Sequence, residues 1–135
     1  MVEIIKVRTG RQGLYEFTYQ VQNLIDRSTL ESGLCSLLIQ HTSASLTIQE
    51  NADPSAKVDL ENWFNRLVVE RDSIYTHTLE GDDDMPAHIK SALTATSLSI
   101  PFKAGRLCLG AWQGIYCWEH RHNASERSVA VHIGN

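Results

Sequence analysis

The sequence lacks most of the features that mark specialised classes of protein. It has only three cysteines, Cys35, Cys108 and Cys117, and no pair has the C-x-x-C spacing of a metal motif. Each lies in an apolar segment, which predicts small, reduced core residues, with a nucleophilic cysteine as the alternative. No stretch approaches the roughly 18 apolar residues of a membrane span, and the N-terminus has no signal-peptide pattern. We therefore expect a cytoplasmic protein with no membrane partner.

Basic residues are too scattered to form a nucleic-acid surface. The 12 Lys and Arg residues occur without a run, and with 16 Asp and Glu residues they leave a net charge of −4. A hydrophobic fraction of 42% and a charged fraction of 21% are ordinary for a globular protein. The chain has no repeat or linker-like tract, so we expect residues 1–135 to form one domain that does not bind nucleic acid.

Alternating apolar residues predict strands at both ends of the chain. Ile5 and Val7 alternate with charged residues up to Gly10 and Gly13, which predicts a first hairpin. The residues from 34 to 41 place an apolar row on one face, with His41 at its end. A short strand follows at residues 45–49, and the last third, from Leu98 to Ile133, alternates in the same way and is expected to be all β.

Two helices are expected between these strands in the first half of the chain. One begins at Thr18 and ends near Gly33. The next begins at Asp53 and Pro54, which have the types of an N-cap and a first-turn proline. Its buried stripe is expected to consist of Leu60, Trp63 or Phe64, Leu67 and Val68.

A third helix is expected from Met85 and Pro86, with Ile89 and Leu93 buried. Helices inserted among antiparallel strand pairs, without strict alternation of strand and helix, predict the α+β class. The expected architecture is a mainly antiparallel sheet on which the helices pack.

The segment from Glu80 to Lys90 is the strongest indication of chemistry. It reads Glu-Gly-Asp-Asp-Asp-Met-Pro-Ala-His-Ile-Lys, and its four carboxylates repel unless a divalent cation, a helix N-terminus or basic partners offset them. A capping role explains one aspartate but not Glu80 and all three aspartates. A metal or a cationic substrate group would explain the surplus and would involve Glu80, Asp84 and His88. The alternative is a solvated acidic loop.

Two other histidine-containing segments carry polar side chains. His41, Thr42 and Ser43 close a buried strand and either turn the chain or present an imidazole and two hydroxyls to a ligand. His120 and His122 share one face of a later strand, an arrangement that can bind zinc, although His122 is near a turn.

Four further polar or aromatic residues are candidates for substrate binding. Asn51 has no simple local explanation, whereas Asp53 is also a candidate N-cap. Trp112 and Gln113 follow Gly110 between two β segments, where the tryptophan forms either an aromatic wall or a buried side chain beside a bulge.

No glycine-rich phosphate loop, Rossmann fingerprint, H-E-x-x-H motif or nucleophile elbow is present, which disfavours the common motif-defined enzymes. The segments around His41, His88 and His120 nevertheless fit a metal or acid-base pocket assembled from distant parts of the chain.

Several longer motifs in a fixed order resemble the YjbQ family. They are His41-Thr-Ser-Ala-Ser-Leu-Thr-Ile, Glu50-Asn-Ala-Asp-Pro, the Glu80 to Lys90 segment, Gly105-Arg-Leu, Gly110-Ala-Trp-Gln-Gly-Ile and Glu119-His-Arg. The resemblance spans nearly the whole chain. It implies a compact α+β or β-sandwich-like subunit that assembles as a homotrimer, and an associated secondary thiamine-phosphate synthase activity. Ala111 stands where a threonine is usual, and residues 123–125 replace a glycine-rich turn, so the shape of the final hairpin is open.

The resemblance also assigns residues to roles. The positions that match the family's motifs are His41, Thr42, Ser43, Asn51, Asp53, His77, Glu80, Asp84, His88, Lys90, Trp112, Gln113, Glu119, His120 and Arg121. We expect the catalytic residues to be His41, Glu80, His88 and Asp53. We expect a divalent metal, Zn or Mg, to be bound by His41, His88, His120, Glu80 and Asp84. The substrate is expected to contact Thr42, Ser43, Asn51, Lys90, Trp112, Gln113 and Arg121, with Lys90 and Arg121 at phosphate.

The leading expectation is a cytoplasmic enzyme that couples a pyrimidine-methyl diphosphate to a thiazole phosphate with loss of diphosphate. A divalent cation and basic side chains would stabilise that leaving group. Two alternatives stay open: a metal-dependent hydrolase of a small phosphorylated compound, and a trimer that binds a small molecule without changing it.

Overall fold

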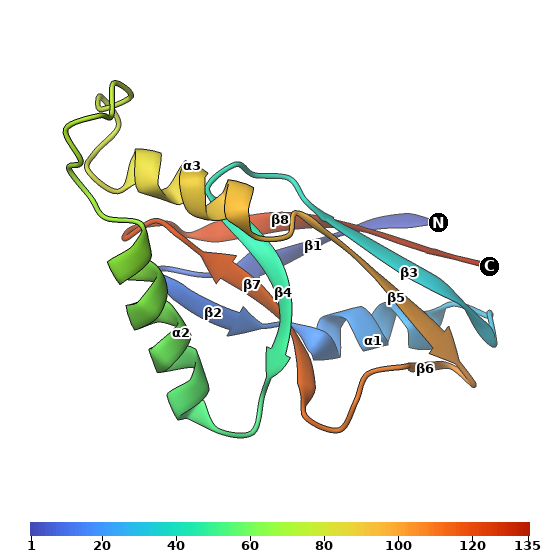
Figure 1. The fold of residues 1–135 in the computed structure, drawn as a ribbon. Helices are drawn as coiled ribbons and strands as arrows, with labels where there is room; N and C mark the ends of the chain where they lie inside the picture. The colour runs from blue at the N-terminus through green and yellow to red at the C-terminus, as the bar shows by residue number, and fades with distance from the viewer.

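The computed structural model describes residues 1–135 as two antiparallel sheets and three helices (Figure 1). The larger sheet has the strand order β1 (Val2–Arg8), β8 (Glu126–Gly134), β3 (Ser32–Ile39), β5 (Ser97–Lys103) and β6 (Arg106–Leu107). The smaller sheet has the order β2 (Gly13–Glu16), β7 (Gln113–Glu119) and β4 (Ala44–Glu50). Every strand pairing is antiparallel, which confirms the α+β class with a mainly antiparallel, sandwich-like core.

The main apolar core joins the two sheets and α1 (Thr18–Arg27). Strand β3 contributes Cys35, Leu37 and Ile39 from one face, as the alternating pattern predicts. Cys117 is buried in the same core, and burial raises its pKa to about 12 and that of Cys35 to about 11. Both thiols are therefore unreactive core residues. Cys108 is exposed, so the expectation of a buried thiol was wrong at that position.

Two local predictions near the N-terminus were wrong. β1 and β2 form no hairpin, because β1 pairs with β8 and β2 pairs with β7, so the chain crosses between the sheets here. Helix α1 ends at Arg27 rather than near Gly33. Gly33 lies in β3, where a Cβ atom would come within 2.1 Å of the Gly134 carbonyl oxygen. The glycine permits close strand packing and does not cap a helix.

Helix α2 (Pro54–Leu67) begins where the sequence predicts. The Asp53 carboxylate accepts a hydrogen bond of 2.9 Å from the Ser55 backbone N–H, and Pro54 occupies the first turn. Phe64 and Val68 are buried against Trp118 of β7. Of the two alternatives Trp63 and Phe64, Phe64 is the buried one, and Leu67 is exposed, so the buried stripe lacks one expected member.

Helix α3 (Asp84–Leu93) has an unexpected buried face. Leu93 is 61% exposed, whereas Asp84, Lys90 and Ser91 are buried. Each of these polar groups has a partner; the Ser91 hydroxyl, for example, donates to the Ala44 carbonyl oxygen at 3.0 Å. The expectation that Leu93 is buried was wrong, because packing on β4 turns the polar side of α3 inward.

Helices α2 and α3 lie at one end of the molecule, and the loop of residues 68–83 that joins them projects away from both sheets (Figure 1). None of the three helices combines the length and the apolar composition that crossing a bilayer requires.

Candidate metal site

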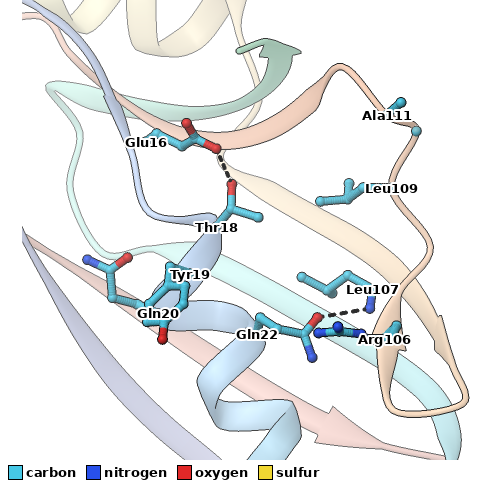
Figure 2. Close-up of a pocket in the computed structure, with 10 residues that line it drawn as sticks. Glu16, Thr18, Tyr19, Gln20, Gln22, Arg106, Leu107, Leu109 and Ala111 are labelled. Carbon is cyan, nitrogen blue, oxygen red and sulfur yellow. Dashed lines mark hydrogen bonds between the residues drawn. The ribbon is translucent and has the colours of Figure 1, made fainter. Parts of the chain in front are cut away.

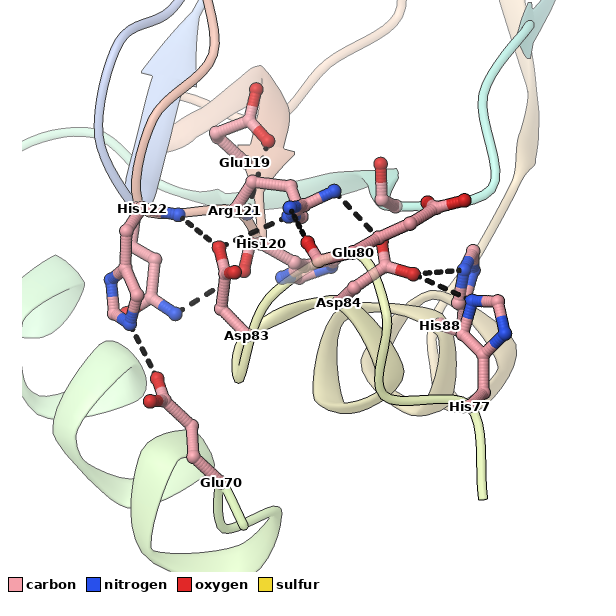
Figure 3. Close-up of polar contacts among 12 residues, drawn as sticks. Glu70, His77, Glu80, Asp83, Asp84, His88, Glu119, His120, Arg121 and His122 are labelled. Atoms are coloured by element: carbon pink, nitrogen blue, oxygen red, sulfur yellow. Dashed lines mark hydrogen bonds and ion pairs between the residues drawn. The ribbon is translucent and has the colours of Figure 1, made fainter. Parts of the chain in front are cut away.

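Two imidazoles and one carboxylate converge at the start of α3. Nε2 of His77 lies 2.7 Å from Oδ2 of Asp84, and Nε2 of His88 lies 3.1 Å from the same oxygen (Figure 3). One ligand atom from each of these three residues lies within 4.8 Å of the other two. His88 and Asp84 are four residues apart and therefore share a face of α3, while His77 comes from the preceding loop.

The tautomer of His88 is fixed by the turn between β3 and β4. Its Nδ1 lies 2.9 Å from the Thr42 carbonyl oxygen, and because a carbonyl can only accept, Nδ1 carries a proton. In this tautomer of the neutral ring, the lone pair of Nε2 points at Oδ2 of Asp84. Two lone pairs at 3.1 Å repel unless a proton or a cation lies between them.

Asp84 is oriented by Arg121. Nη1 of Arg121 donates to Oδ1 of Asp84 at 2.7 Å, so Oδ2 is the oxygen that faces the histidines. Nε of Arg121 donates to Asp83 at 3.0 Å, and Nη2 donates to the Glu80 carbonyl oxygen at 2.9 Å. The hydrogen bond to Asp83 raises the pKa of Arg121. Burial opposes ionisation of Asp83, but the hydrogen bonds from Arg121 and from the His122 backbone lower the pKa of that carboxyl.

A buried ion pair supports this arrangement from the other side. The Glu119 carboxylate accepts from Nε of Arg127 at 2.7 Å, from the Thr9 hydroxyl at 2.8 Å and from the Arg121 backbone N–H at 3.1 Å. Arg127 also donates to the Ser43 hydroxyl at 2.9 Å. Glu119 is fully buried, so the pair ties β7, β8 and the β3–β4 turn together beside the cluster.

The donor set fits a divalent transition metal. Imidazole and carboxylate ligands suit zinc, and a backbone carbonyl that fixes the outer ring nitrogen of a ligating histidine is the usual supporting contact. His77 and His88 are partly exposed, whereas Asp84 is 2% exposed, so one side of the site faces solvent and can admit a ligand.

The structure brings several of the expected site residues to this end of the sheets, but not all of them as ligands. Glu80 lies beside Asp84 with an exposed side chain (Figure 3). Nε2 of His41 accepts from the Ser128 backbone N–H at 2.8 Å, so that nitrogen is already engaged. Burial, and then the charge of Arg127, lower the pKa of His41.

His120 and Lys90 are buried behind the cluster. Nε2 of His120 bonds the Ser45 hydroxyl at 2.9 Å, and its Nδ1 is buried without a partner. Burial, with the charges of Lys90 and Arg127, lowers the pKa of His120 to about 3. The Lys90 ammonium donates to the Asn65 side chain and lies 5.6 Å from the Phe64 ring centre; burial lowers its pKa.

The remaining candidates lie at the opposite end of the smaller sheet. Asn51 bonds the Trp112 carbonyl oxygen through its backbone, and Gln113 bonds the Gly110 backbone N–H. Asp53 caps α2. Seven-residue strands β4 and β7 separate these residues from Ser43 and His120, a span of about 20 Å. One small ligand cannot bridge both ends within one chain.

A cavity of about 840 Å³ lies near that far end, between the start of α1 and residues 106–111 (Figure 2). Its wall is held by hydrogen bonds from the Thr18 hydroxyl to Glu16 at 2.8 Å and from the Leu107 backbone to Gln22 at 3.1 Å. None of the converging histidines or aspartates lines this cavity, so its volume is not by itself evidence of a reactive site.

Sequence reasoning from local patterns gave His77 little weight and did not consider Arg127 or Asn65. His77 lies in an irregular loop, where no local pattern indicates it, and only the family resemblance named it. Arg127 had a usable signal, because it alternates with Val129, Val131 and Ile133 and therefore lies on the buried face of β8. A charged residue on a buried strand face requires a partner, and Glu119 is that partner.

Comparisons with known proteins agree with one another. A family model described as UPF0047 protein YjbQ-like matches residues 3–135. The UPF0047 protein sll1880 of Synechocystis is 49% identical over 131 residues, covering 97% of this chain and 89% of the relative. YjbQ of Escherichia coli O157:H7 is 46% identical, with 89% and 88% covered.

Solved structures show the same fold. An uncharacterised conserved protein of the YjbQ/UPF0047 family from Clostridium acetobutylicum superposes with a TM-score of 0.89 at 32% identity, covering 98% of this chain and 99% of that one. A protein of unknown function from Sulfolobus solfataricus, described as YbjQ-like, has a TM-score of 0.89 at 26% identity, with 98% and 95% covered.

Removing one member of the buried ion pair is expected to destabilise the fold. Glu119→Leu or Arg127→Met alone leaves a buried charge unpaired, and we expect each to lower the free energy of unfolding by about 3–5 kcal/mol. The double variant has no unpaired charge, so its loss of unfolding free energy should be clearly smaller than the sum of the losses in the two single variants. Urea denaturation of the four proteins measures this cycle, and simple additivity would show that the two side chains do not interact.

His120 should make stability depend on acid. In the unfolded chain its imidazole takes up a proton as the pH falls through 6.5, whereas in the folded protein it stays neutral until the pH approaches about 3. Stability is therefore full above pH 6.5 and falls as the pH drops toward 3, by about 1.4 kcal/mol per pH unit from this group. Urea denaturation of wild type and His120→Gln between pH 7 and pH 4 tests this. The unfolding free energy of the variant should fall less steeply with decreasing pH, because the contribution of His120 is absent. Identical slopes would contradict the assignment.

Proposed function

This chain belongs to the UPF0047 protein YjbQ-like family, and we propose that it is a metal-dependent hydrolase of a small phosphorylated compound. The observation that carries the proposal is the convergence of the two Nε2 atoms of His77 and His88 on Oδ2 of Asp84. A cation at that point removes the lone-pair repulsion and uses donors that the fold already orients.

The residues of the cluster have separate roles in this proposal. His77, Asp84 and His88 hold the cation, and Arg121 keeps Asp84 in place. A divalent cation bound there would polarise a phosphoryl oxygen and lower the pKa of a nearby water. Glu80 has an exposed carboxylate beside Asp84, and we assign proton transfer to it.

The engagement of the basic side chains favours hydrolysis over loss of diphosphate. Arg121 spends Nε, Nη1 and Nη2 on Asp83, Asp84 and the Glu80 carbonyl, and Lys90 is buried against Asn65. Lys90 is therefore not free for the diphosphate that a thiamine-phosphate synthase would release, and three of the five N–H donors of Arg121 are already used. That coupling activity, expected from the family resemblance, stays a prediction, as does binding without turnover.

The expected homotrimer also stays a prediction. Trp63 and Leu67 of α2 and Leu93 of α3 are exposed and line a groove with Phe64 at its base. An apolar surface of this kind is commonly buried between subunits.

Metal binding tests the site directly. We expect His77→Ala and His88→Ala to weaken zinc binding by at least about tenfold, because each removes one of three donors. Titration calorimetry with zinc, together with metal analysis of the purified protein, measures the effect. His132→Ala is the matched control, since His132 is an exposed histidine on β8 that contacts the Met1 carbonyl. Affinities in the two site variants equal to that of the control would refute the site.

A panel of reactions tests the activity. The zinc-loaded or magnesium-loaded protein is assayed for phosphate release from small phosphate monoesters, and in parallel for coupling of a pyrimidine-methyl diphosphate to a thiazole phosphate. We expect phosphate release that His88→Ala abolishes. Coupling without monoester hydrolysis would replace the hydrolase with a transferase, and recovery of every compound unchanged would leave a binding protein.

A further inference from the structure

Beside the candidate metal site, a second candidate binding site lies at the loop between α2 and α3. A partly open cavity of about 240 Å³ lies at this loop, and its lining includes Arg71, Tyr75 and His77 together with the acidic residues Asp72 and Asp82. His77 therefore borders both the cavity and the metal site. A molecule in the cavity can therefore contact His77, one of the three proposed cation ligands.

The loop around the cavity is a built structure. The Asp72 carboxylate accepts from the Ile74 backbone N–H at 3.1 Å, and the Asp72 carbonyl accepts from the Tyr75 backbone N–H at 3.1 Å. The Tyr75 hydroxyl donates to the Val69 carbonyl oxygen at 2.8 Å. These contacts close the first part of the loop on itself, and hydrogen bonds from Arg121 and His122 to Asp83 hold its end against the segment after β7.

Arg71 adopts a strained backbone conformation in this loop. Its φ is +58°, in the left-handed region that residues other than glycine rarely occupy. Such strain costs on the order of 1–3 kcal/mol and persists where the surroundings impose it, commonly at ligand sites. The side chain of this residue is part of the cavity lining.

The guanidinium of Arg71 has more unused N–H donors than that of Arg121. Its one hydrogen bond within the protein runs from Nη1 to Oδ2 of Asp82 at 3.0 Å, although the group carries five N–H donors. The side chain is 72% exposed, so this surface ion pair is weak and easily exchanged for another anion.

We propose that this cavity binds the anionic group, a phosphate or a carboxylate, of the small compound that the metal site transforms, with Arg71 as the recognising residue. Arg71 and His77, one of the proposed cation ligands, both line the cavity, so the guanidinium and a cation held at His77 both attract an anion there, against the opposing charges of Asp72 and Asp82. The volume is below the roughly 300 Å³ at which pockets for larger ligands begin, so the ligand is small. The inference rests on the proposed function for the role of the cation, but not for anion binding by Arg71.

Two substitutions that break the same ion pair should have opposite effects on binding of inorganic phosphate. Arg71→Gln removes the recognising charge and should weaken phosphate binding by about tenfold. Asp82→Asn removes the competing carboxylate, leaves Arg71 free and should tighten binding by about threefold. Arg66→Gln, which changes the net charge equally at an exposed residue of α2 outside the cavity, should leave it unchanged. Titration calorimetry of the folded proteins measures all three.

A change in the same direction for Arg71→Gln and Asp82→Asn would show that the pair only stabilises the loop, and would overturn the proposal. An effect of Arg66→Gln equal to that of Arg71→Gln would overturn it too. Acetate in place of phosphate distinguishes the source, since preferential binding of either ion through Arg71 identifies the group. The two proposals can fail separately. If the wild-type protein does not bind zinc, the hydrolase is rejected. The dependence of phosphate binding on Arg71 can still be measured in the metal-free protein, and it tests the cavity alone.

Discussion

The ion pair between Glu119 and Arg127 is the contact on which the rest of the site depends. It is buried where β7, β8 and the turn after β3 meet. The Glu119 carboxylate also accepts a hydrogen bond from the Arg121 backbone N–H, which fixes the position of the Arg121 backbone. Arg121 in turn orients Asp84, and Asp84 determines where the two histidines converge. A charge that must be paired in the core thus fixes the geometry of a site at the surface.

Helix α3 shows how the site is supplied with polar groups. Its packing against β4 buries Asp84 and Lys90 and exposes Leu93. Burial of ionisable groups is unfavourable unless each finds partners. Here Asp84 faces Arg121 and two histidines, while Lys90 reaches Asn65. The helix therefore leaves an apolar side chain exposed, and it presents a carboxylate and an imidazole, four residues apart, to the loop between α2 and α3.

The residues of the site come from two kinds of structure: regular elements, namely α3 and the turn between β3 and β4, and the irregular loop between α2 and α3. His88 and Asp84 stand on α3, and the Thr42 carbonyl that fixes the ring of His88 belongs to the turn between two core strands. His77 and Arg71 come from the projecting loop, which is held by its own hydrogen bonds and by those that Arg121 and His122 donate to it. The helix and the turn set the geometry of the candidate metal ligands, while the loop supplies the residues that we propose bind the compound.

The sequence by itself determined the strands, the start of α2 and the segment that carries the chemistry. These follow from local causes: alternation places Cys35, Leu37 and Ile39 on one face, and Asp53 with Pro54 begins a helix whatever lies around them. The surplus of carboxylates between Glu80 and Asp84 could also be recognised locally, as could its neighbour His88. Only the tertiary structure decided which residues share the site. It joined His77 to His88, engaged His41 with Ser128, and left Asn51 and Trp112 at the far end of β4 and β7. The physical reason is that strand partners and helix rotation are set by non-local packing, which no spacing along the chain encodes.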